Sequence, residues 1–186
     1  MTEKLKKLWP ADGHLNEAQA DFLITLLTKL KPKNCLEIGF GTGRSALVVL
    51  ETAKPKKLVS IDISVVAPNL PYQNFTGVQG ASHKVLNSEF FAEYFPTSGL
   101  IDFAFIDGGH TYKEAYSDLK NCFENLKSGG IIVVDDYYSC EPDGYPLPDV
   151  NRAVDTYLAE TPQAVLVEKW HCNGKGLAVI SKTETA

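Results

Sequence analysis

The chain has 186 residues, of which 44% are hydrophobic, and its 18 basic and 23 acidic side chains give a formal net charge of −5. This composition is that of a folded protein rather than a disordered one, and the length predicts a single domain over 1–186. The acidic balance argues against a general nucleic-acid-binding protein, which would carry basic stripes.

The first residues and the cysteines favour a cytoplasmic protein. The first residues are charged and lack the apolar core of a signal peptide, and no stretch approaches the roughly 20 apolar residues that cross a membrane. The four cysteines form no CxxC pair, so we expect neither a zinc nor a redox motif. We therefore expect neither a membrane nor a nucleic acid as a partner.

Helix and strand patterns alternate along the chain. A capping box at 16–19 opens the first predicted helix, which ends before Pro32. A second capping box at 111–114 opens the clearest helix, which is expected to run to the glycines at 129 and 130. Further helices are predicted over 46–53, 84–94 and 150–158, and strands over 35–38, 57–62, 75–80, 101–106, 130–134, 164–170 and 177–181. Strands separated by helices indicate a parallel sheet, and the short link between the last two strands makes the final strand antiparallel.

A glycine-rich turn follows the first predicted strand. It has the spacing GxGxG over 39–43, rather than the GxGxxG of a dinucleotide-binding loop. Glu37, two residues before the first glycine, would repel a pyrophosphate but attract an ammonium group. Asp62 ends the second predicted strand, where a carboxylate can accept hydrogen bonds from ribose hydroxyls. Together these features favour a nucleoside ligand without phosphates.

The segment LEIGFGTGRSA, followed by LVSIDIS, resembles the first two motifs of class I S-adenosylmethionine-dependent methyltransferases. The resemblance implies an α/β fold with a Rossmann-like, doubly wound, mostly parallel seven-stranded sheet whose last strand is antiparallel. It also implies that Glu37 and the glycine loop hold the methionine part, Asp62 the ribose and QGAS the adenine. The implied cofactor residues are Glu37, Gly39, Phe40, Gly41, Gly43, Ser45, Asp62, Ile63, Ala81, Ser82 and Asp107. Pro68 and Pro71 interrupt the crossover helix that is usual in this family, so a loop is expected beside the adenine.

Acidic side chains follow two further predicted strands. Asp107 follows the strand over 101–106, and Asp135 and Asp136 follow the strand over 130–134. If these strands are neighbours, their ends lie about 5 Å apart, and a hard cation such as Mg²⁺ or Mn²⁺ would relieve the repulsion among three carboxylates. A bound metal could lower the pKa of a substrate hydroxyl. His110, at the rim of the same predicted cleft, suits a general base near neutral pH.

The pattern IDGGH…DD resembles the metal-dependent O-methyltransferases related to the macrocin and sugar-modifying enzymes. In that group the matching aspartates bind metal and the matching histidine is the base. The resemblance therefore implies Mg²⁺ or Mn²⁺ at Asp107, Asp135 and Asp136, catalysis by His110, and methylation of a small-molecule hydroxyl. We expect the acceptor to be selected by the N-terminal segment 1–14 and an active-site loop over 137–148, or by the neighbouring subunit of a homodimer.

Other interpretations of the same residues remain open. Asp107, Asp135 and Asp136 could satisfy backbone donors in turns, and His110 could be a helix-entry residue. A metal-independent methyltransferase acting on nitrogen or a carboxylate would use the same fold. An NAD(P)-binding oxidoreductase would also suit Asp62, and a non-catalytic binding module could retain the pocket.

Aromatic side chains near the predicted cleft also have two interpretations. Tyr137 and Tyr138 could line the substrate pocket or could lie partly buried at the surface. Trp9 and His14 could fold over the cleft, although a surface anchor is the simpler interpretation.

Overall fold

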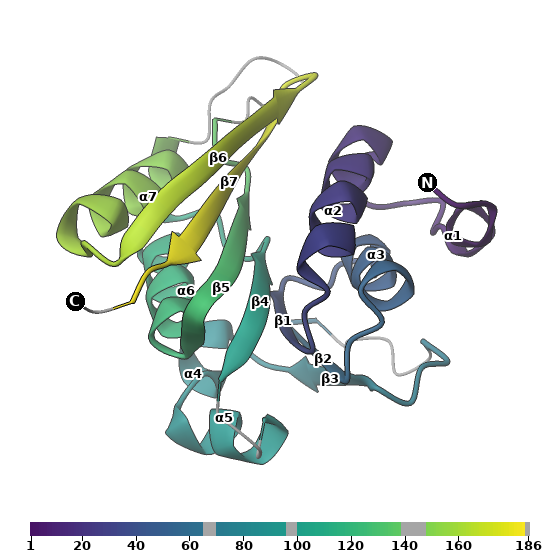
Figure 1. The fold of residues 1–186 in the computed structure, drawn as a ribbon, viewed down its shortest axis with the longest axis horizontal. Coiled ribbons are helices and arrows are strands. Elements are labelled where there is room, and N and C mark those ends of the chain that lie inside the picture. The colour runs from purple at the N-terminus through teal and green to yellow at the C-terminus, as the bar shows by residue number, and fades with distance from the viewer. Residues whose placement is uncertain (65–69, 96–99, 139–147, 185–186) are drawn as a thin grey trace.

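A seven-stranded sheet runs through the centre of the molecule in the order β3-β2-β1-β4-β5-β7-β6 (Figure 1). The computed structural model describes residues 1–64, 70–95, 100–138 and 148–184. The strands are β1 Asn34–Ile38, β2 Lys57–Asp62, β3 Phe75–Gln79, β4 Ile101–Ile106, β5 Leu126–Asp135, β6 Ala164–Cys172 and β7 Lys175–Lys182. Neighbouring strands are parallel except β7, which is antiparallel to both β5 and β6. The predicted α/β fold with a reversed last strand is therefore confirmed.

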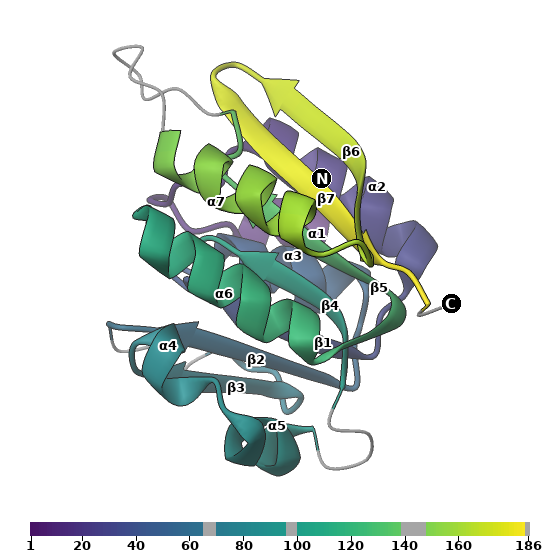
Figure 2. The same ribbon diagram turned by 90° about the vertical axis from the view of Figure 1, so that its left-hand side faces the viewer.

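Helices cover both faces of the sheet (Figures 1 and 2). On one face lie α1 Glu3–Leu8, α2 Glu17–Leu30 and α3 Arg44–Thr52, and on the other α4 Ser82–Val85, α5 Ser88–Tyr94, α6 Tyr112–Glu124 and α7 Pro148–Glu160. Alternation along β5 shows why both faces need cover. Ile131 and Val133 belong to the core beneath α1–α3, whereas Ile132 and Val134 belong to the core beneath α6 and α7.

Local sequence determines where two of the long helices begin. Asn16 Oδ1 accepts the backbone N–H of Gln19 at 2.9 Å, and Gln19 Oε1 accepts that of Asn16 at 3.0 Å. Thr111 and Glu114 form the same reciprocal pair at the start of α6. Each pair satisfies backbone N–H groups at the start of the helix, which have no carbonyl acceptor because no helical turn precedes them. Both predicted capping boxes are confirmed.

Two predicted helix boundaries are wrong. The helix expected over 84–94 is two short helices, because Leu86 is extended and buried and the side chain of Asn87 caps α5. The helix α6 ends at Glu124 rather than at the glycines, and β5 begins at Leu126. Leu126 is buried and paired with β4, so burial in the sheet is favoured over one more helical turn.

Two predictions concern segments that are only partly described. Of the expected loop over 137–148, the structure describes Tyr137, Tyr138 and Pro148. Of the two prolines expected to interrupt the crossover after β2, Pro68 lies outside the described residues. Residues 70–74 form no helix, in agreement with the loop predicted between β2 and β3. Within the described ranges, no helix is long and apolar enough to cross a membrane.

The strand order reverses between β1 and β4. The helix α3 follows β1 over one face of the sheet, and α6 follows β4 over the other. Ligands of open α/β sheets bind at the carboxyl ends of the strands at such a reversal. The ends of β1, β2 and β4 line the cavities described below.

Candidate cofactor and metal site

The glycine loop leaves β1 with backbone angles that favour glycine. Gly39, Gly41 and Gly43 have φ values of 88°, 52° and 86°. A Cβ at Gly39 would overlap the backbone carbonyl of Asp107, so the loops after β1 and β4 approach each other only because a side chain is absent. At Gly41, apart from the glycine and its two chain neighbours, no described atom lies within 4 Å of the Cβ position. The loop is therefore a cradle with its open side at Gly41.

Asp62, at the end of β2, fixes the glycine loop to the second strand. Its Oδ2 accepts the backbone N–H groups of Phe40 at 2.8 Å and Gly41 at 3.0 Å, and its Oδ1 accepts that of Ser64 at 2.8 Å. Burial would raise the pKa of Asp62, but these hydrogen bonds outweigh burial and lower the pKa below its ordinary value. The carboxylate is thus ionised and held beside the loop.

Glu37 lies near the end of β1 and is fully buried. Its Oε2 accepts a hydrogen bond from Ser60 Oγ, whereas its Oε1 has no partner among the described residues. Burial raises the pKa of Glu37 to about 7, although the nearby Ser45 and Ser60 hydroxyls act in the opposite direction. An unpaired buried carboxylate oxygen is costly, so Glu37 is suited to a cationic or hydrogen-bond-donating ligand group.

Two cavities meet beside the glycine loop. The first, of about 290 Å³, lies beyond the carboxyl ends of β2 and β3, and the second, of about 240 Å³, lies over the loop itself. Both are lined by Gly39, Asp62, Asp107 and Gly108. The first also includes Ile63, Ala81 and Ser82, and the second Phe40, Gly41 and Ser45. Glu37 and Gly43 line neither cavity, but the structure brings the other predicted cofactor residues to one continuous surface.

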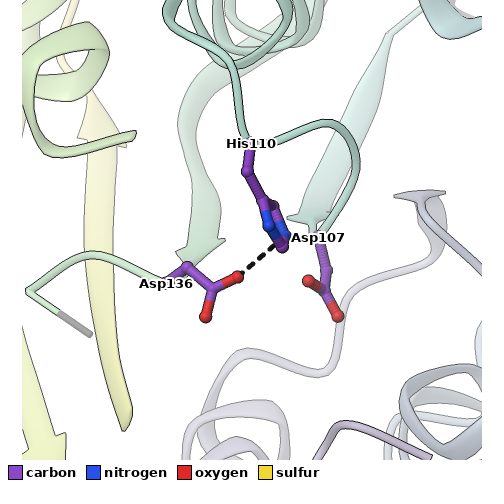
Figure 3. Close-up of side chains that lie close together, drawn as sticks. All are labelled: Asp107, His110 and Asp136. Atoms are coloured by element: carbon purple, nitrogen blue, oxygen red, sulfur yellow. Dashed lines mark ion pairs between the residues drawn. The ribbon is translucent and has the colours of Figure 1, made fainter. Parts of the chain in front are cut away.

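Asp107, His110 and Asp136 converge at the edge of the second cavity (Figure 3). One ligand atom from each lies within 4.8 Å of the other two, and His110 Nε2 is 3.0 Å from Asp136 Oδ2. Asp136 has a φ of 61°, a left-handed conformation that aspartate tolerates. Asp135 lies outside this group, and its Oδ1 accepts hydrogen bonds from Gln19 Nε2 at 2.7 Å and from the N–H of Asp136 at 2.8 Å. The structure therefore brings His110, rather than Asp135, together with Asp107 and Asp136. Asp107, His110 and Asp136 are called the acidic group below.

The carboxylates of this region titrate differently because their surroundings differ. Burial, followed by the charges of Asp135 and Asp136, raises the pKa of Asp107 well above its ordinary value. Burial and the charge of Asp136 raise the pKa of Asp135 to about 7. Burial would also raise the pKa of Asp136, but the hydrogen bond from His110 and the charge of Lys175 lower it to about 2. Asp136 therefore carries a negative charge throughout the physiological range.

Sequence comparison assigns the chain to a family. Residues 36–137 match the family described as a methyltransferase domain, and this range covers more than half of the chain. The chain belongs to that family. The predicted relationship to S-adenosylmethionine-dependent methyltransferases is thereby confirmed.

Solved methyltransferase structures share the fold of this family member at low sequence identity. The O-methyltransferase from Bacillus cereus, in complex with SAH, has a TM-score of 0.67 and 15% identity over 97% of this chain and 90% of that chain. The SAH-bound methyltransferase PaMTH1 from Podospora anserina has a TM-score of 0.67 and 20% identity over 98% and 86%. MycE from the mycinamycin biosynthetic pathway, in complex with Mg, SAH and mycinamycin VI, has a TM-score of 0.68 and 16% identity over 97% and 54%. At these identities the likeness shows the fold.

One curated relative is similar in sequence. An uncharacterised protein of Acanthamoeba polyphaga mimivirus is 29% identical over an alignment of 128 residues, which covers 64% of this chain and 58% of the relative. The chain thus matches less than two thirds of the length of that relative.

The N-terminal segment of this methyltransferase-family chain packs on the residue that follows the glycine loop. Arg44 donates hydrogen bonds to four backbone carbonyls within residues 10–15, at distances of 2.7 to 3.1 Å. Its guanidinium carbon lies 5.0 Å from the centroid of the Trp9 ring. His14 and Leu15 line the second cavity. The structure therefore places the end of the predicted acceptor-selecting segment beside the acidic group, with Trp9 as an anchor.

We expect Arg44→Lys to loosen this segment, because an ammonium group cannot bond to four carbonyls as a planar guanidinium does. The variant should show faster amide hydrogen exchange over residues 9–15 and lose roughly 1–3 kcal/mol of unfolding free energy. Arg152→Lys is the matched control, since Arg152 also lies over an aromatic ring but is largely exposed on α7. Equal effects of the two substitutions on exchange over 9–15 would contradict the assigned role.

Two charged residues of this region were missed by sequence analysis. Lys175, the first residue of β7, lines the second cavity and places its Nζ 3.0 Å from Asp136 Oδ1. Asp118 of α6 is buried beside the first cavity and accepts a hydrogen bond from Ser82 Oγ at 2.5 Å, and burial raises the pKa of Asp118 to about 6. Lys175 comes from an element far along the chain, whereas Asp118 lies on α6, which begins just after His110. The contacts of both residues depend on the fold, so no local sequence pattern marks them.

The two tyrosines that follow Asp136 line neither of the two cavities. Tyr137 is buried, and its hydroxyl donates a hydrogen bond to Asp155 Oδ1 at 2.7 Å. Tyr138 is exposed, and Lys169 Nζ lies 4.7 Å from the centroid of its ring. Tyr138 therefore fits the interpretation of a partly buried surface residue, whereas Tyr137 is fully buried and fits neither interpretation.

Proposed function

We propose that the chain transfers a methyl group from S-adenosylmethionine to a hydroxyl oxygen of a small-molecule acceptor, with the assistance of a bound Mg²⁺ or Mn²⁺. The observation that carries this proposal is the junction of the two cavities, where the glycine loop and Asp62 meet Asp107 of the acidic group. A cofactor held on one side of Asp107 and an acceptor held on the other would bring methyl donor and oxygen together. Alignment of two reactants can account for a large part of the barrier reduction in such a transfer.

The cofactor side offers groups that suit the separate parts of S-adenosylmethionine. The unpaired Oε1 of Glu37 suits the ammonium group, and the ionised Asp62 suits the ribose hydroxyls. Ile63, a residue that is 75% exposed and lines the first cavity, offers an apolar surface to the base beside Ala81 and Ser82. The sulfonium group of the cofactor supplies the activated methyl. The role of these residues is to bind the cofactor and to orient it.

The donor set of the acidic group suits a hard divalent cation. Asp107 and Asp136 offer carboxylate oxygens within reach of each other, and the low pKa of Asp136 keeps it ionised. A bound cation would polarise the acceptor hydroxyl and lower its pKa. In this proposal Asp107 and Asp136 hold the cation.

His110 would accept the proton of the acceptor hydroxyl. Its Nε2 lies 3.0 Å from Asp136 Oδ2, so Nε2 carries a proton that it donates to this carboxylate, and Nδ1 is left as the accepting atom. The His110 side chain is 51% exposed at the edge of the second cavity, where an acceptor could reach it. Asp136 would thus serve both to hold the cation and to orient the base.

The test is methyl transfer from radiolabelled S-adenosylmethionine to a panel of catechols, sugars and other vicinal diols, with and without a chelator. Chelation should abolish turnover and added Mg²⁺ should restore it. Unchanged turnover in the chelator would remove the metal from the proposal and leave the methyl transfer. Tight binding of S-adenosylhomocysteine without transfer to any acceptor would favour a non-catalytic binding module.

A second candidate function is a metal-independent methyltransferase that acts on nitrogen or a carboxylate. One observation favours it, because the ammonium group of Lys175 already pairs with Asp136 Oδ1 at 3.0 Å. Metal analysis of the purified protein separates the two candidates. The family match and the GxGxG spacing disfavour an NAD(P)-binding oxidoreductase, and a thermal-shift comparison of NAD⁺ with S-adenosylhomocysteine tests this.

Gly41→Val should abolish cofactor binding. The left-handed φ of 52° disfavours valine, and the branched side chain would fill the open space where the cofactor is proposed to lie. Calorimetry with S-adenosylhomocysteine should show a loss of affinity of at least about a hundredfold. Gly129→Val is the matched control, because Gly129 has a φ of 73° and open space around it but lines neither cavity. Parental affinity in Gly41→Val, or an equal loss in Gly129→Val, would show that the pocket is assigned wrongly.

A further inference from the structure

The carboxylate of Asp136 lies between two nitrogen-bearing side chains. His110 Nε2 is 3.0 Å from its Oδ2, and Lys175 Nζ is 3.0 Å from its Oδ1. The Asp136 side chain is only 4% exposed, so few water molecules can compete for either oxygen. Both oxygens of the carboxylate are therefore engaged by protein groups.

The hairpin between β6 and β7 positions Lys175 at this point. Asn173 and Gly174 have φ values of 51° and 77°, which are the left-handed angles of a tight two-residue hairpin turn. Lys175 follows as the first residue of β7, with its side chain 30% exposed at the second cavity. A regular turn and a paired strand thus hold the lysine backbone, and the flexible part is the side chain alone.

The positive charge of Lys175 attracts more than one carboxylate near the second cavity. Its ammonium pairs with Asp136 Oδ1 and also attracts the carboxylates of Asp135 and Asp107. A divalent cation bound at Asp107 and Asp136 would meet this positive charge at the same carboxylate. Two cations that share one largely buried carboxylate repel each other more strongly than they would in water, because the surroundings screen them poorly.

We propose that Lys175 is a tethered counter-ion of the candidate metal site and competes with the divalent cation for Asp136. This inference rests on the metal site of the proposed function. Without metal, the ammonium of Lys175 neutralises part of the carboxylate charge. Repulsion among the carboxylates therefore costs the metal-free protein little stability. With metal, the ammonium must leave Oδ1 or tolerate the added charge, so Lys175 weakens metal affinity and sets the cation concentration that fills the site.

The test is Mn²⁺ binding to the full chain, measured by electron paramagnetic resonance and by calorimetry in the absence of cofactor and acceptor. Lys175→Met keeps the length and apolar stem of the side chain and removes the charge, so it should bind Mn²⁺ at least about tenfold more tightly than the parent. Lys175→Arg keeps the charge and should retain the weak parental affinity. Lys169→Met is the matched control, because Lys169 lies on the neighbouring strand β6 and lines neither of the two cavities. It should stay within about twofold of the parent.

Unfolding temperatures give a second readout. The metal-free Lys175→Met variant should unfold at a lower temperature than the metal-free parent, and Mn²⁺ should raise its unfolding temperature by more. Unchanged or weaker Mn²⁺ binding in a folded Lys175→Met variant would overturn the inference and would make Lys175 a positioning group for Asp136. If no variant binds Mn²⁺ while S-adenosylhomocysteine still binds, both the inference and the metal site fail, and the cofactor pocket stands.

Discussion

Asp136→Asn is expected to lower metal-stimulated methyl transfer by at least about a hundredfold, while the affinity for S-adenosylhomocysteine stays within about twofold. Asparagine keeps the shape of the side chain and tolerates the φ of 61° at this position, so the substitution removes mainly the charge. The pKa of Asp136 is lowered to about 2, whereas the pKa values of Asp107 and Asp135 are raised, so the charge of Asp136 is the most firmly held of the three. The variant should therefore lose the cation and the negative charge beside His110, although its amide oxygen can still accept a hydrogen bond from His110 Nε2.

Asp135→Asn is the matched control for this prediction. In this variant the amide oxygen can still accept the hydrogen bond from Gln19. In the parent the pKa of Asp135 is raised to about 7, so the Asp135 carboxylate is only partly ionised near neutral pH. We expect a much smaller loss of Mn²⁺ affinity and of turnover than in Asp136→Asn. If the two variants lost Mn²⁺ affinity equally, Asp135 would have to join the metal ligands, as the sequence resemblance implies.

The fold could be predicted because its signals are local. The four apolar residues at 131–134 predict a strand covered on both sides, and the two capping boxes mark the starts of α2 and α6. The glycine loop and Asp62 could be placed together because consecutive parallel strands end at the same edge of the sheet. The helix over 84–94 was predicted from the spacing of apolar residues alone. Leu86 fits that spacing because it is buried, but its backbone is extended, so the break between α4 and α5 was missed.

The acidic group could be predicted only in part. Side chains alternate along a strand, so Asp135 follows Ile131 and Val133 towards the face covered by α2, where Gln19 bonds to it. Asp136 comes after the strand and turns through a left-handed conformation towards His110. Asp135 and Asp136 are thus adjacent in sequence but contact different parts of the fold, Gln19 of α2 and His110. No local pattern marks Lys175, because its contact with Asp136 depends on the pairing of β7 with β5.

Glu37→Gln should make the cofactor-free protein more stable and its affinity for S-adenosylhomocysteine lower by about tenfold or more. Burial raises the pKa of Glu37 from 4.5 to about 7, so the folded state binds the proton more tightly than the unfolded state does. Stability is therefore lost as the pH rises from about 4.5 to about 7, by up to about 3 kcal/mol once the carboxylate is ionised in both states. Glutamine does not ionise, and its own unpaired amide offsets part of the gain, which leaves roughly 1–3 kcal/mol at pH 8.

The pH dependence distinguishes this cause from a simple packing effect. At pH 4, where the Glu37 carboxyl is largely neutral, the Glu37→Gln variant should be no more stable than the parent and should be less stable by the cost of its unpaired amide. The variant should gain stability relative to the parent as the pH rises. Glu51→Gln should change stability in the opposite direction at pH 8, because Lys4 and Tyr72 outweigh burial and lower the pKa of Glu51. A constant difference at both pH values would assign the effect of Glu37→Gln to packing instead. A gain in stability that appears only on ionisation, together with weaker cofactor binding, would mean that the buried charge of Glu37 opposes folding and is retained for the ligand.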